Sequence, residues 1–310
     1  MPFCNLLKSK KESTCLDFLS ILYKRSKKAK NIHKINIDII VTMKFFFFIK
    51  IIFINFIKNL LRKFSININY IYKKKTLIFL KKIYIYDCDY KLIRVGSKRD
   101  GGYLVPDILS KIKYCFSAGV GTNSSFEDNL KKFKIKSFLA DGTVSYYGQH
   151  QFVRKNINTF NDHKNITFEK FVEVSLGNKK DNNLLLKMDI EGDEIKTLCN
   201  IGESLLKNTA IFIIEFHNFD IILNKFGLAM YDCAFTKLLK YFSICHIHPN
   251  NAWGVTEIFN IEIPNFIECT FLNNRYIKKK SKIKYSLPHI FDCQNKKEIE
   301  DIKLSKFFYN

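Results

Sequence analysis

The chain has 310 residues, of which 47% are hydrophobic, enough for a packed core and too apolar for a disordered protein. The formal charge of +22 is unevenly placed: residues 1–90 carry +14, residues 91–270 only +2, and residues 271–310 carry +6. Because the central part is nearly neutral and only six of the 51 basic residues are Arg, we do not expect a nucleic-acid-binding protein. The nine scattered cysteines, with no C-x-x-C pair, predict reduced thiols in a cytoplasmic protein and no zinc site.

The first 82 residues differ in composition from the rest. Residues 1–42 are a Lys-rich N-terminal extension, and the true start could be Met43. Residues 43–82 are a basic amphipathic segment and a linker. Within residues 43–64, polar and basic side chains gather on one face of a helix of Phe, Ile and Leu, and the interruption by Lys50 disfavours a transmembrane helix. Two interpretations stay open: a helix on an anionic membrane surface, or a helix packed on the protein's own core or on a partner.

Residues 83–276 form the predicted catalytic domain, in which apolar runs alternate with helix-like stretches. After a short strand flanked by turns in 96–107, strands are predicted at 113–119, 136–141, 183–191, 210–217, 242–249 and 265–272. This alternation predicts an α/β fold with a mostly parallel sheet and helices on both faces. The last two strands are close enough in sequence to form an antiparallel pair at the C-terminal end. Residues 277–310 are predicted to be a basic C-terminal tail.

The first group of candidate site residues is a glycine turn after the first of these parallel strands. Gly119 and Gly121 are separated by one residue, which allows a sharp turn and a close approach of a ligand to the backbone. Asp141 ends the next strand, where an acid commonly accepts hydrogen bonds from ribose hydroxyls. Ser124 stands where a dinucleotide-binding turn has its third glycine. No pyrophosphate cradle is evident, which favours S-adenosylmethionine over a dinucleotide.

The second group follows the apolar strand that contains Lys187. Asp189 and Glu191 come at its carboxyl end, where open α/β sheets bind ligands, and they share one face if the strand continues that far. Such a pair can position a substrate hydroxyl, assist its deprotonation or hold a divalent cation. Asp193 and Glu194 are interpreted only as acids that favour a helix N-terminus.

Histidines form the third group of candidates. His217 ends the next parallel strand and is a candidate general base, although a structural histidine capped by a backbone carbonyl is the alternative. His246 and His248 alternate on a later strand, but no third ligand has diagnostic spacing, so no metal ligand is assigned. Asn250 and Asn251 are candidates for hydrogen bonds to a polar substrate, or for a turn.

Several motifs in this order resemble the FkbM-type methyltransferases. LLLKMDIEGDE (184–194) is similar to that family's LKxDxEGxE signature. RVGSKRDGGYLVPD, SAGVGTNSSFE and FLADGT resemble a subgroup with a DGGY segment. The similarity covers roughly residues 92–272. Many members carry an acid where this chain has Ser117.

The resemblance implies a class I methyltransferase fold (Rossmann-like), S-adenosylmethionine as cofactor and, usually, methyl transfer to oxygen on sugars, glycans or natural products. The residues implied to bind the cofactor are Ser117, Gly119, Gly121 and Asp141. The residues that it implies at the reacting end are Asp189 and Glu191. His217 joins them as a candidate catalytic residue from its position at the end of the next strand.

The sequence therefore predicts an S-adenosylmethionine-dependent O-methyltransferase acting on a saccharide, glycan or related small molecule. Two alternatives stay open: a non-catalytic methyltransferase-like binding module at a membrane surface, and a nucleotide-using sugar-modifying enzyme. The expected location is cytoplasmic, with a peripheral position on the inner face of a membrane through residues 43–64 as the second option.

Overall fold

The computed structural model describes residues 73–309, except 146, 147, 180, 259 and 260. The predictions about residues 1–42 and 43–64 lie outside the described residues and stay predictions. No helix among the described residues is both long and apolar enough to cross a membrane.

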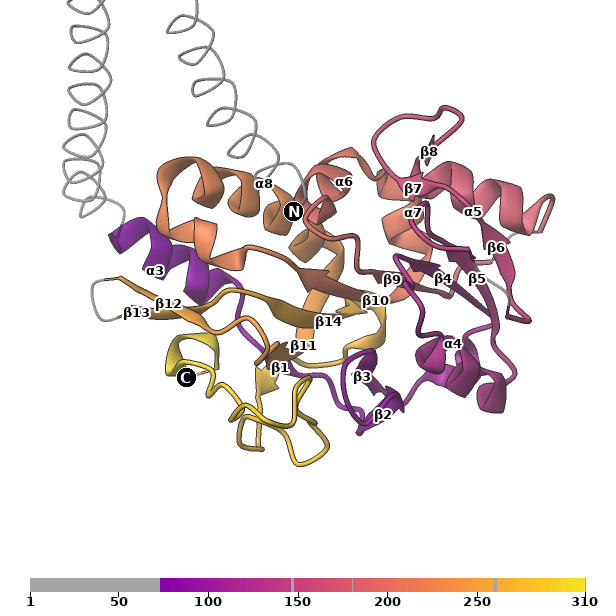
Figure 1. Ribbon diagram of the computed structural model, residues 1–310. Helices are drawn as coiled ribbons and strands as arrows, with labels where there is room; N and C mark the ends of the chain where they lie inside the picture. The colour runs from indigo at the N-terminus through magenta and orange to yellow at the C-terminus, as the bar shows by residue number, and fades with distance from the viewer. Residues whose placement is uncertain (1–72, 146–147, 180, 259–260, 310) are drawn as a thin grey trace, which may run out of the picture. The chain divides into compact units, whose positions relative to one another are not determined.

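The largest sheet has seven strands. Their order across the sheet is β11 (Phe242–Pro249), β14 (Ile267–Asn273), β10 (Thr209–Phe216), β9 (Leu184–Met188), β4 (Tyr114–Ala118), β5 (Lys136–Ala140) and β6 (Gln151–Val153). Strand β14 is antiparallel to β10 and to β11, whereas β10, β9, β4, β5 and β6 pair in parallel (Figure 1). The sheet is thus mostly parallel, with β14 inserted antiparallel between β10 and β11, as the predicted α/β fold requires. The predicted fold class, including the antiparallel pair near the C-terminus, is confirmed.

Each face of the sheet buries its own hydrophobic core because side chains alternate along a strand. In β9, Leu184, Leu186 and Met188 belong to one core and Leu185 to the other. This explains why the sequence of β9 is a continuous apolar run, as expected for a strand covered on both sides. The covering helices of the first core are α3 (Lys73–Lys82), α5 (Phe168–Leu176), α6 (Glu194–Asn200), α7 (Glu203–Asn208) and α8 (Lys225–Tyr241). The second core is covered by α4 (Ser125–Leu130) and by the hairpin of β2 (Leu92–Gly96) and β3 (Gly102–Pro106).

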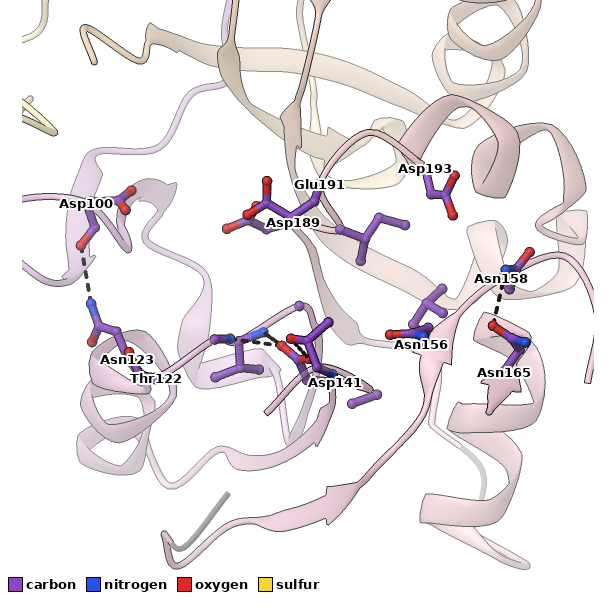
Figure 2. Close-up of a pocket in the computed structure, with 17 residues that line it drawn as sticks. Asp100, Thr122, Asn123, Asp141, Asn156, Asn158, Asn165, Asp189, Glu191 and Asp193 are labelled. Carbon is purple, nitrogen blue, oxygen red and sulfur yellow. Dashed lines mark hydrogen bonds between the residues drawn. The ribbon is translucent and has the colours of Figure 1, made fainter. Parts of the chain in front are cut away.

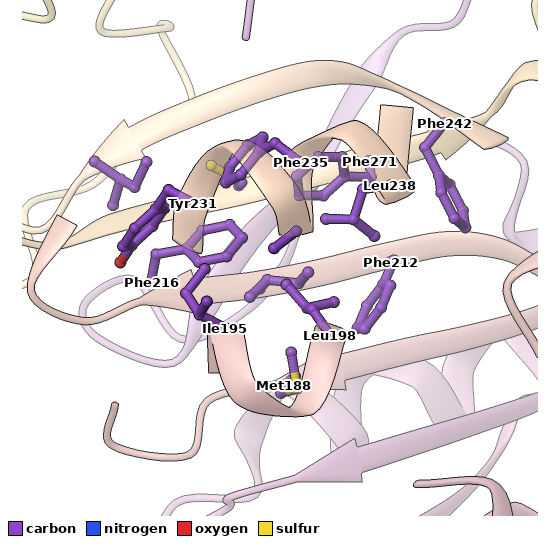
Figure 3. Packing of buried hydrophobic residues seen from close by; sticks show 14 of the residues in the cluster. Met188, Ile195, Leu198, Phe212, Phe216, Tyr231, Phe235, Leu238, Phe242 and Phe271 are labelled. Carbon is purple, nitrogen blue, oxygen red and sulfur yellow. The ribbon is translucent and has the colours of Figure 1, made fainter. Parts of the chain in front are cut away.

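The first core is rich in aromatic rings. Phe216 packs on Phe235 of α8 with ring centroids 5.0 Å apart, and Phe235 also contacts Phe271 of β14 (Figure 3). Such contacts add to the free energy of burial that already favours large apolar side chains in a core. They fix α8 against β10 and β14, and so fix the loop after β10 that carries His217.

Backbone angles and caps set two helix boundaries near the site. Helices α6 and α7 are separate because Ile201 (ψ 129°) and Gly202 (ψ 147°) leave the helical region between them. Helix α8 begins at Lys225, where the Asn224 side chain accepts a hydrogen bond from the Gly227 N–H at 2.8 Å.

Short elements complete the described fold. The remaining strands are β1 (Tyr86–Asp87), β7 (Asn156–Ile157), β8 (Asn165–Ile166), β12 (Val255–Ile258), β13 (Ile261–Pro264) and β15 (Ser281–Lys282). The 3-10 turns are η2 (Leu109–Lys111), η3 (Lys131–Phe133), η4 (Phe219–Leu223), η5 (Asn274–Tyr276) and η6 (Lys306–Phe308). Strands of two to four residues are too short to show a period of two, and the sequence pattern did not predict them.

Residues outside the predicted domain limits 83–276 contribute to the same core. Phe79 and Leu80 of α3 and Phe308 near the C-terminus are fully buried. The Ile85 N–H donates to the Phe308 carbonyl at 2.8 Å, and β1 pairs with β15. The boundaries themselves stay predictions, but the described part of the C-terminal segment packs on the domain.

Candidate functional site

A cleft of about 410 Å³ lies at the carboxyl ends of β4, β5 and β9, within the size range of small-molecule sites (Figure 2). Its lining residues are Asp100, Gly119, Val120, Gly121, Thr122, Asn123, Ala140, Asp141, Thr143, Asn156, Ile157, Asn158, Asn165, Asp189, Ile190, Glu191 and Asp193. Asp189 and Glu191 lie on one side of the cleft and Asp141 lies across from them. Five of these residues are acids, and the described lining contains no Lys or Arg.

The two glycines of the turn after β4 have different roles. Gly119 has φ +71°, and a Cβ there would lie 1.7 Å from the Asp189 carbonyl oxygen. Gly119 is therefore required because the turn crosses the end of β9. The buried Lys187 ammonium also fixes this turn, because it donates a hydrogen bond to the Gly119 carbonyl at 3.1 Å. Gly121 has φ +57° and no atom within 4 Å of an added Cβ, so open space lies beside it.

Asp141 holds the glycine turn in place. One of its carboxylate oxygens accepts hydrogen bonds from the N–H groups of Val120 (3.0 Å) and Gly121 (2.9 Å). The other accepts from the N–H (2.7 Å) and hydroxyl (2.6 Å) of Thr143. Burial raises the pKa of Asp141, but these hydrogen bonds lower it overall. Since a carboxylate has about four acceptor sites, a ribose hydroxyl would have to replace one of these contacts. The predicted ribose contact stays a prediction.

Ser117 lies beneath the cleft and is fully buried. Its hydroxyl donates to Glu127 Oε1 of α4 at 2.5 Å, and it is not among the described lining residues. The predicted cofactor contact of Ser117 stays a prediction, and the contact that the structure shows joins β4 to α4.

The three predicted catalytic residues come together. Nε2 of His217 lies 3.4 Å from Glu191 Oε2 and 3.7 Å from Asp189 Oδ1. The expected reason for their proximity is corrected: β9 ends at Met188, so Asp189 and Glu191 do not share a strand face. A turn with Glu191 at φ 58° and Gly192 at φ 106° turns the two carboxylates toward each other instead. Their catalytic roles stay predictions.

Glu194 is the residue of this group that sequence reasoning missed. It is 1% exposed, and its Oε1 accepts hydrogen bonds from the N–H groups of Ile190 (3.0 Å) and Gly192 (3.1 Å). The same oxygen is 2.9 Å from Nδ1 of His217. The expected structural alternative for His217, a cap by a backbone carbonyl, is therefore replaced by a carboxylate partner. The sequence signal was present as a third acid in EGDE, but it matched an ordinary helix start.

Burial sets the electrostatics of this group. Burial raises the pKa of Asp189 to about 6, although Lys187 and His217 lower it. Burial lowers the pKa of His217, but the hydrogen bond to Glu194 and the charges of Asp189 and Glu191 raise it overall. Asp189 is thus a carboxylate whose pKa approaches neutrality beside an imidazole, a combination suited to proton transfer.

A second group of acids lies next to the cleft. One carboxylate oxygen from each of Asp100, Glu215 and Glu268 lies within 4.8 Å of the others. Burial raises the pKa of Glu215 well above its ordinary value, and Asp189 and Glu268 raise it further. Asn250 donates to Glu215 at 2.8 Å, so the predicted role of Asn250 in binding a substrate stays a prediction. Asp100, before the paired glycines of DGGY, could have been found from that motif, whereas Glu268 lies inside a strand and had no signal.

The other predicted polar residues contact the C-terminal segment. His246 Nε2 lies 2.9 Å from Asp292 Oδ1, and His248 lies between Glu268 and Asp301. The Asn251 amide donates to two backbone carbonyls of the segment, at 2.8 and 2.9 Å. These contacts, and not a cleft, surround the HIHPNN stretch.

No family model matches the chain, and no curated protein matches it. Among solved structures, the Methanococcus jannaschii fibrillarin pre-rRNA processing protein is 10% identical over 60% of this chain and 83% of that chain, with a TM-score of 0.32. The magnesium protoporphyrin IX methyltransferase (ChlM) of Synechocystis with bound SAM is 12% identical over 53% and 71%, with a TM-score of 0.27. These likenesses are distant, and the fold class rests on the strand order and directions described above.

Proposed function

We propose that this chain is an S-adenosylmethionine-dependent O-methyltransferase of the FkbM type that acts on a saccharide, glycan or related polyhydroxyl molecule. The observation that carries the proposal is the cleft at the carboxyl ends of β4, β5 and β9, which is lined by acids and reaches the Asp189, Glu191 and His217 group. Ligands of open α/β sheets bind at this edge.

The charge of the cleft supports this cofactor over a dinucleotide. S-adenosylmethionine carries a sulfonium and an ammonium group, and five acids lie on the lining: Asp100, Asp141, Asp189, Glu191 and Asp193. A pyrophosphate is anionic and requires N–H donors or basic side chains, and the described lining has no Lys or Arg. The same observation counts against the alternative of a nucleotide-using enzyme.

When bound, the cofactor supplies an electrophilic methyl group, and the chain has to hold and deprotonate the acceptor oxygen. Asp189 is 25% exposed at its side chain, so it is accessible from the cleft, and its pKa of about 6 suits a proton acceptor. His217 lies against Asp189 and stabilises its negative charge, whereas the neighbouring Glu191 carboxylate raises the pKa of Asp189. Correct placement of the hydroxyl provides much of the expected rate gain.

Support for a polyhydroxyl acceptor comes from the second acid group. Glu215 and Glu268 are buried beside Asp100. An ionised carboxylate accepts hydrogen bonds from hydroxyls, and a protonated carboxyl group, which the raised pKa of Glu215 favours, also donates one. Adjacent hydroxyls of a sugar ring match several acceptors placed within 4.8 Å of one another. The retained acids at the reacting end argue against a non-catalytic binding module.

The test is calorimetric titration of S-adenosylmethionine into the full-length chain, beside a parallel titration of NADH. We expect micromolar binding of the first ligand and none of the second. Glu173→Gln is the control, because Glu173 is exposed on α5, pairs with Lys170 and does not line the cleft. Methyl transfer from labelled cofactor to a panel of free and lipid-linked saccharides then tests the acceptor class.

Binding of NADH in place of S-adenosylmethionine would overturn the proposal and leave only the fold. If S-adenosylmethionine binds but no methyl group is transferred to any hydroxyl of the panel, the proposed saccharide acceptor is overturned and the proposed cofactor is kept. Because Asp141 holds the glycine turn, its substitution alone does not identify a ribose contact. A comparison of S-adenosylhomocysteine with its 2′-deoxy analogue in wild type and Asp141→Asn does.

A further inference from the structure

We propose that Asp189, Glu191 and His217 form a binding site for one divalent first-row transition-metal ion, with Glu194 as the residue that orients His217. The three side chains each offer one ligand atom, and these atoms all lie within 4.8 Å of one another. Metal binding is separate from cofactor binding, and only the use of the metal in catalysis rests on the proposed function.

The separations between the atoms suit a shared ion. His217 Nε2 is 3.4 Å from Glu191 Oε2 and 3.7 Å from Asp189 Oδ1. Two ligand atoms that are each about 2.1 Å from one ion lie roughly 3.0–3.5 Å apart. Small side-chain rotations close the difference, since Glu191 is 85% exposed at its side chain and Asp189 is 25% exposed.

The orientation of His217 is the second, independent observation. Its Nδ1 lies 2.9 Å from Glu194 Oε1, and Glu194 is buried and anchored by the N–H groups of Ile190 and Gly192. With Nδ1 donating to Glu194, Nε2 keeps its lone pair and faces the two carboxylates. A carboxylate behind a histidine that binds a metal is the usual arrangement, because it fixes the tautomer and the ring direction.

Electrostatics also favour a cation at this point. Nε2 and the two carboxylates are all acceptors, so a proton or a cation must lie between them. The Lys187 ammonium is 3.9 Å from Asp189 Oδ2 but is engaged at the Gly119 carbonyl. One imidazole with two carboxylates suits Mn²⁺, Fe²⁺ or Zn²⁺ better than Mg²⁺ or Ca²⁺, which prefer oxygen ligands only.

On the proposed function, an ion held there would lower the pKa of a bound hydroxyl. The ion would thus help to remove the proton from the acceptor hydroxyl, a step that Asp189 alone assists as a proton acceptor. The open side of the group faces the cleft, since Asp189 and Glu191 both line it (Figure 2).

The test measures metal binding directly, without the methyl donor. The full-length chain is stripped with a chelator and titrated with Mn²⁺ and, separately, with Zn²⁺ and Mg²⁺, followed by calorimetry and by loss of the free Mn²⁺ spin-resonance signal. We expect one Mn²⁺ or Zn²⁺ per chain and at least tenfold weaker binding of Mg²⁺. His217→Ala and Asp189→Asn should each weaken Mn²⁺ binding by a factor of about 100 or more, and Glu194→Gln by about 10–100.

Glu173→Gln is the control, because Glu173 is exposed on α5 outside the cleft, and we expect it to change the metal dissociation constant less than twofold. Circular dichroism and thermal unfolding show whether each variant is folded, and Asp189→Asn keeps the test valid if His217→Ala fails to fold. The proposal is overturned if the folded wild type binds no Mn²⁺ or Zn²⁺, or if His217→Ala and Asp189→Asn bind as well as wild type. If the wild type binds S-adenosylmethionine but no metal, only this inference is overturned. If it binds metal but not S-adenosylmethionine, only the methyltransferase proposal is overturned.

Discussion

Two histidines in this protein have similar sequence surroundings and different structural settings. His217 follows β10 and is 7% exposed, and His248 lies on β11 and is 3% exposed. Each lies between carboxylates: His217 has Glu194 on one side and Asp189 and Glu191 on the other, and His248 has Glu268 and Asp301. The difference is that Asp189 and Glu191 line a cleft, whereas Asp301 belongs to the segment that covers His248.

The C-terminal segment that covers His248 gives a histidine between carboxylates a structural role, whereas the same residue types beside an open cleft are available for chemistry. His248 has a carboxylate at each ring nitrogen, at 3.3 Å in both cases, and so both nitrogens have a partner. Asn251 and Asn295 fasten the same segment to the sheet. The group around His217 keeps acceptors directed at an accessible space. We therefore expect substitutions at the first histidine's group to affect chemistry and substitutions at the second to affect stability.

The largest expected effect is on methyl transfer in Asp189→Asn. The amide retains the shape of the side chain but neither accepts the acceptor's proton nor binds a cation well, so we expect the rate to fall by about 10²–10⁴-fold. Initial rates under saturating cofactor measure this. Wild-type activity in Asp189→Asn would contradict a chemical role for the His217 group. An equal loss of activity in folded His248→Gln would contradict the purely structural role of the His248 group.

The second effect is on stability in His248→Gln. Burial lowers the pKa of His248, but Asp301 and Glu268 raise it to about 10. Because the folded pKa is above the ordinary value of 6.5, the protonated ring stabilises the fold fully below about pH 6.5, and this contribution is lost as the pH rises through 10. We expect His248→Gln to cost about 3 kcal/mol at pH 6.5 and to flatten the decline between pH 6.5 and 10.

Denaturant unfolding of both proteins at pH 6.5, 8 and 9.5 measures this effect. Unfolding curves that stay parallel across these pH values would show that His248 carries no charge-linked stability. His246→Gln serves as a comparison on the same strand, since His246 has its described ion pair with Asp292 alone.

The sequence predicted the site better where chemistry follows strand ends than where it depends on turns. Asp189 and His217 follow β9 and β10, and parallel neighbours bring their carboxyl ends together. The position of Glu191 depends on a turn with positive φ at Glu191 and Gly192, which no periodicity encodes. Glu194 was visible as an acid, but its role requires knowing that His217 folds back against it.

The fold was predictable for a related reason. Long apolar runs such as β9 and β10 signal strands buried on both faces, and the helices between them were visible by their period. The packing of the C-terminal segment was not predictable, because it depends on isolated contacts, such as His248 with Asp301 and Phe308 in the core, that are far apart in sequence.

The smallest expected effect is on stability in Asp189→Asn, which should stabilise the protein although it slows methyl transfer. Burial raises the pKa of Asp189 to about 6, above its ordinary value of 3.8, so ionising this carboxyl group opposes folding. The cost is absent below about pH 4 and develops as the pH rises through 6. A pKa shift of about two units corresponds to at most roughly 3 kcal/mol, and we expect the free energy of unfolding of Asp189→Asn to exceed that of the wild type by about 1–2 kcal/mol at pH 7.5 and not at pH 4.

Chelator in the unfolding buffer removes any metal that would stabilise the wild type. Equal stability of the two proteins at pH 7.5 would mean that Lys187 and His217 fully offset the cost of burying the Asp189 charge. The group around His217 would then resemble the group around His248, in which the charges are paired.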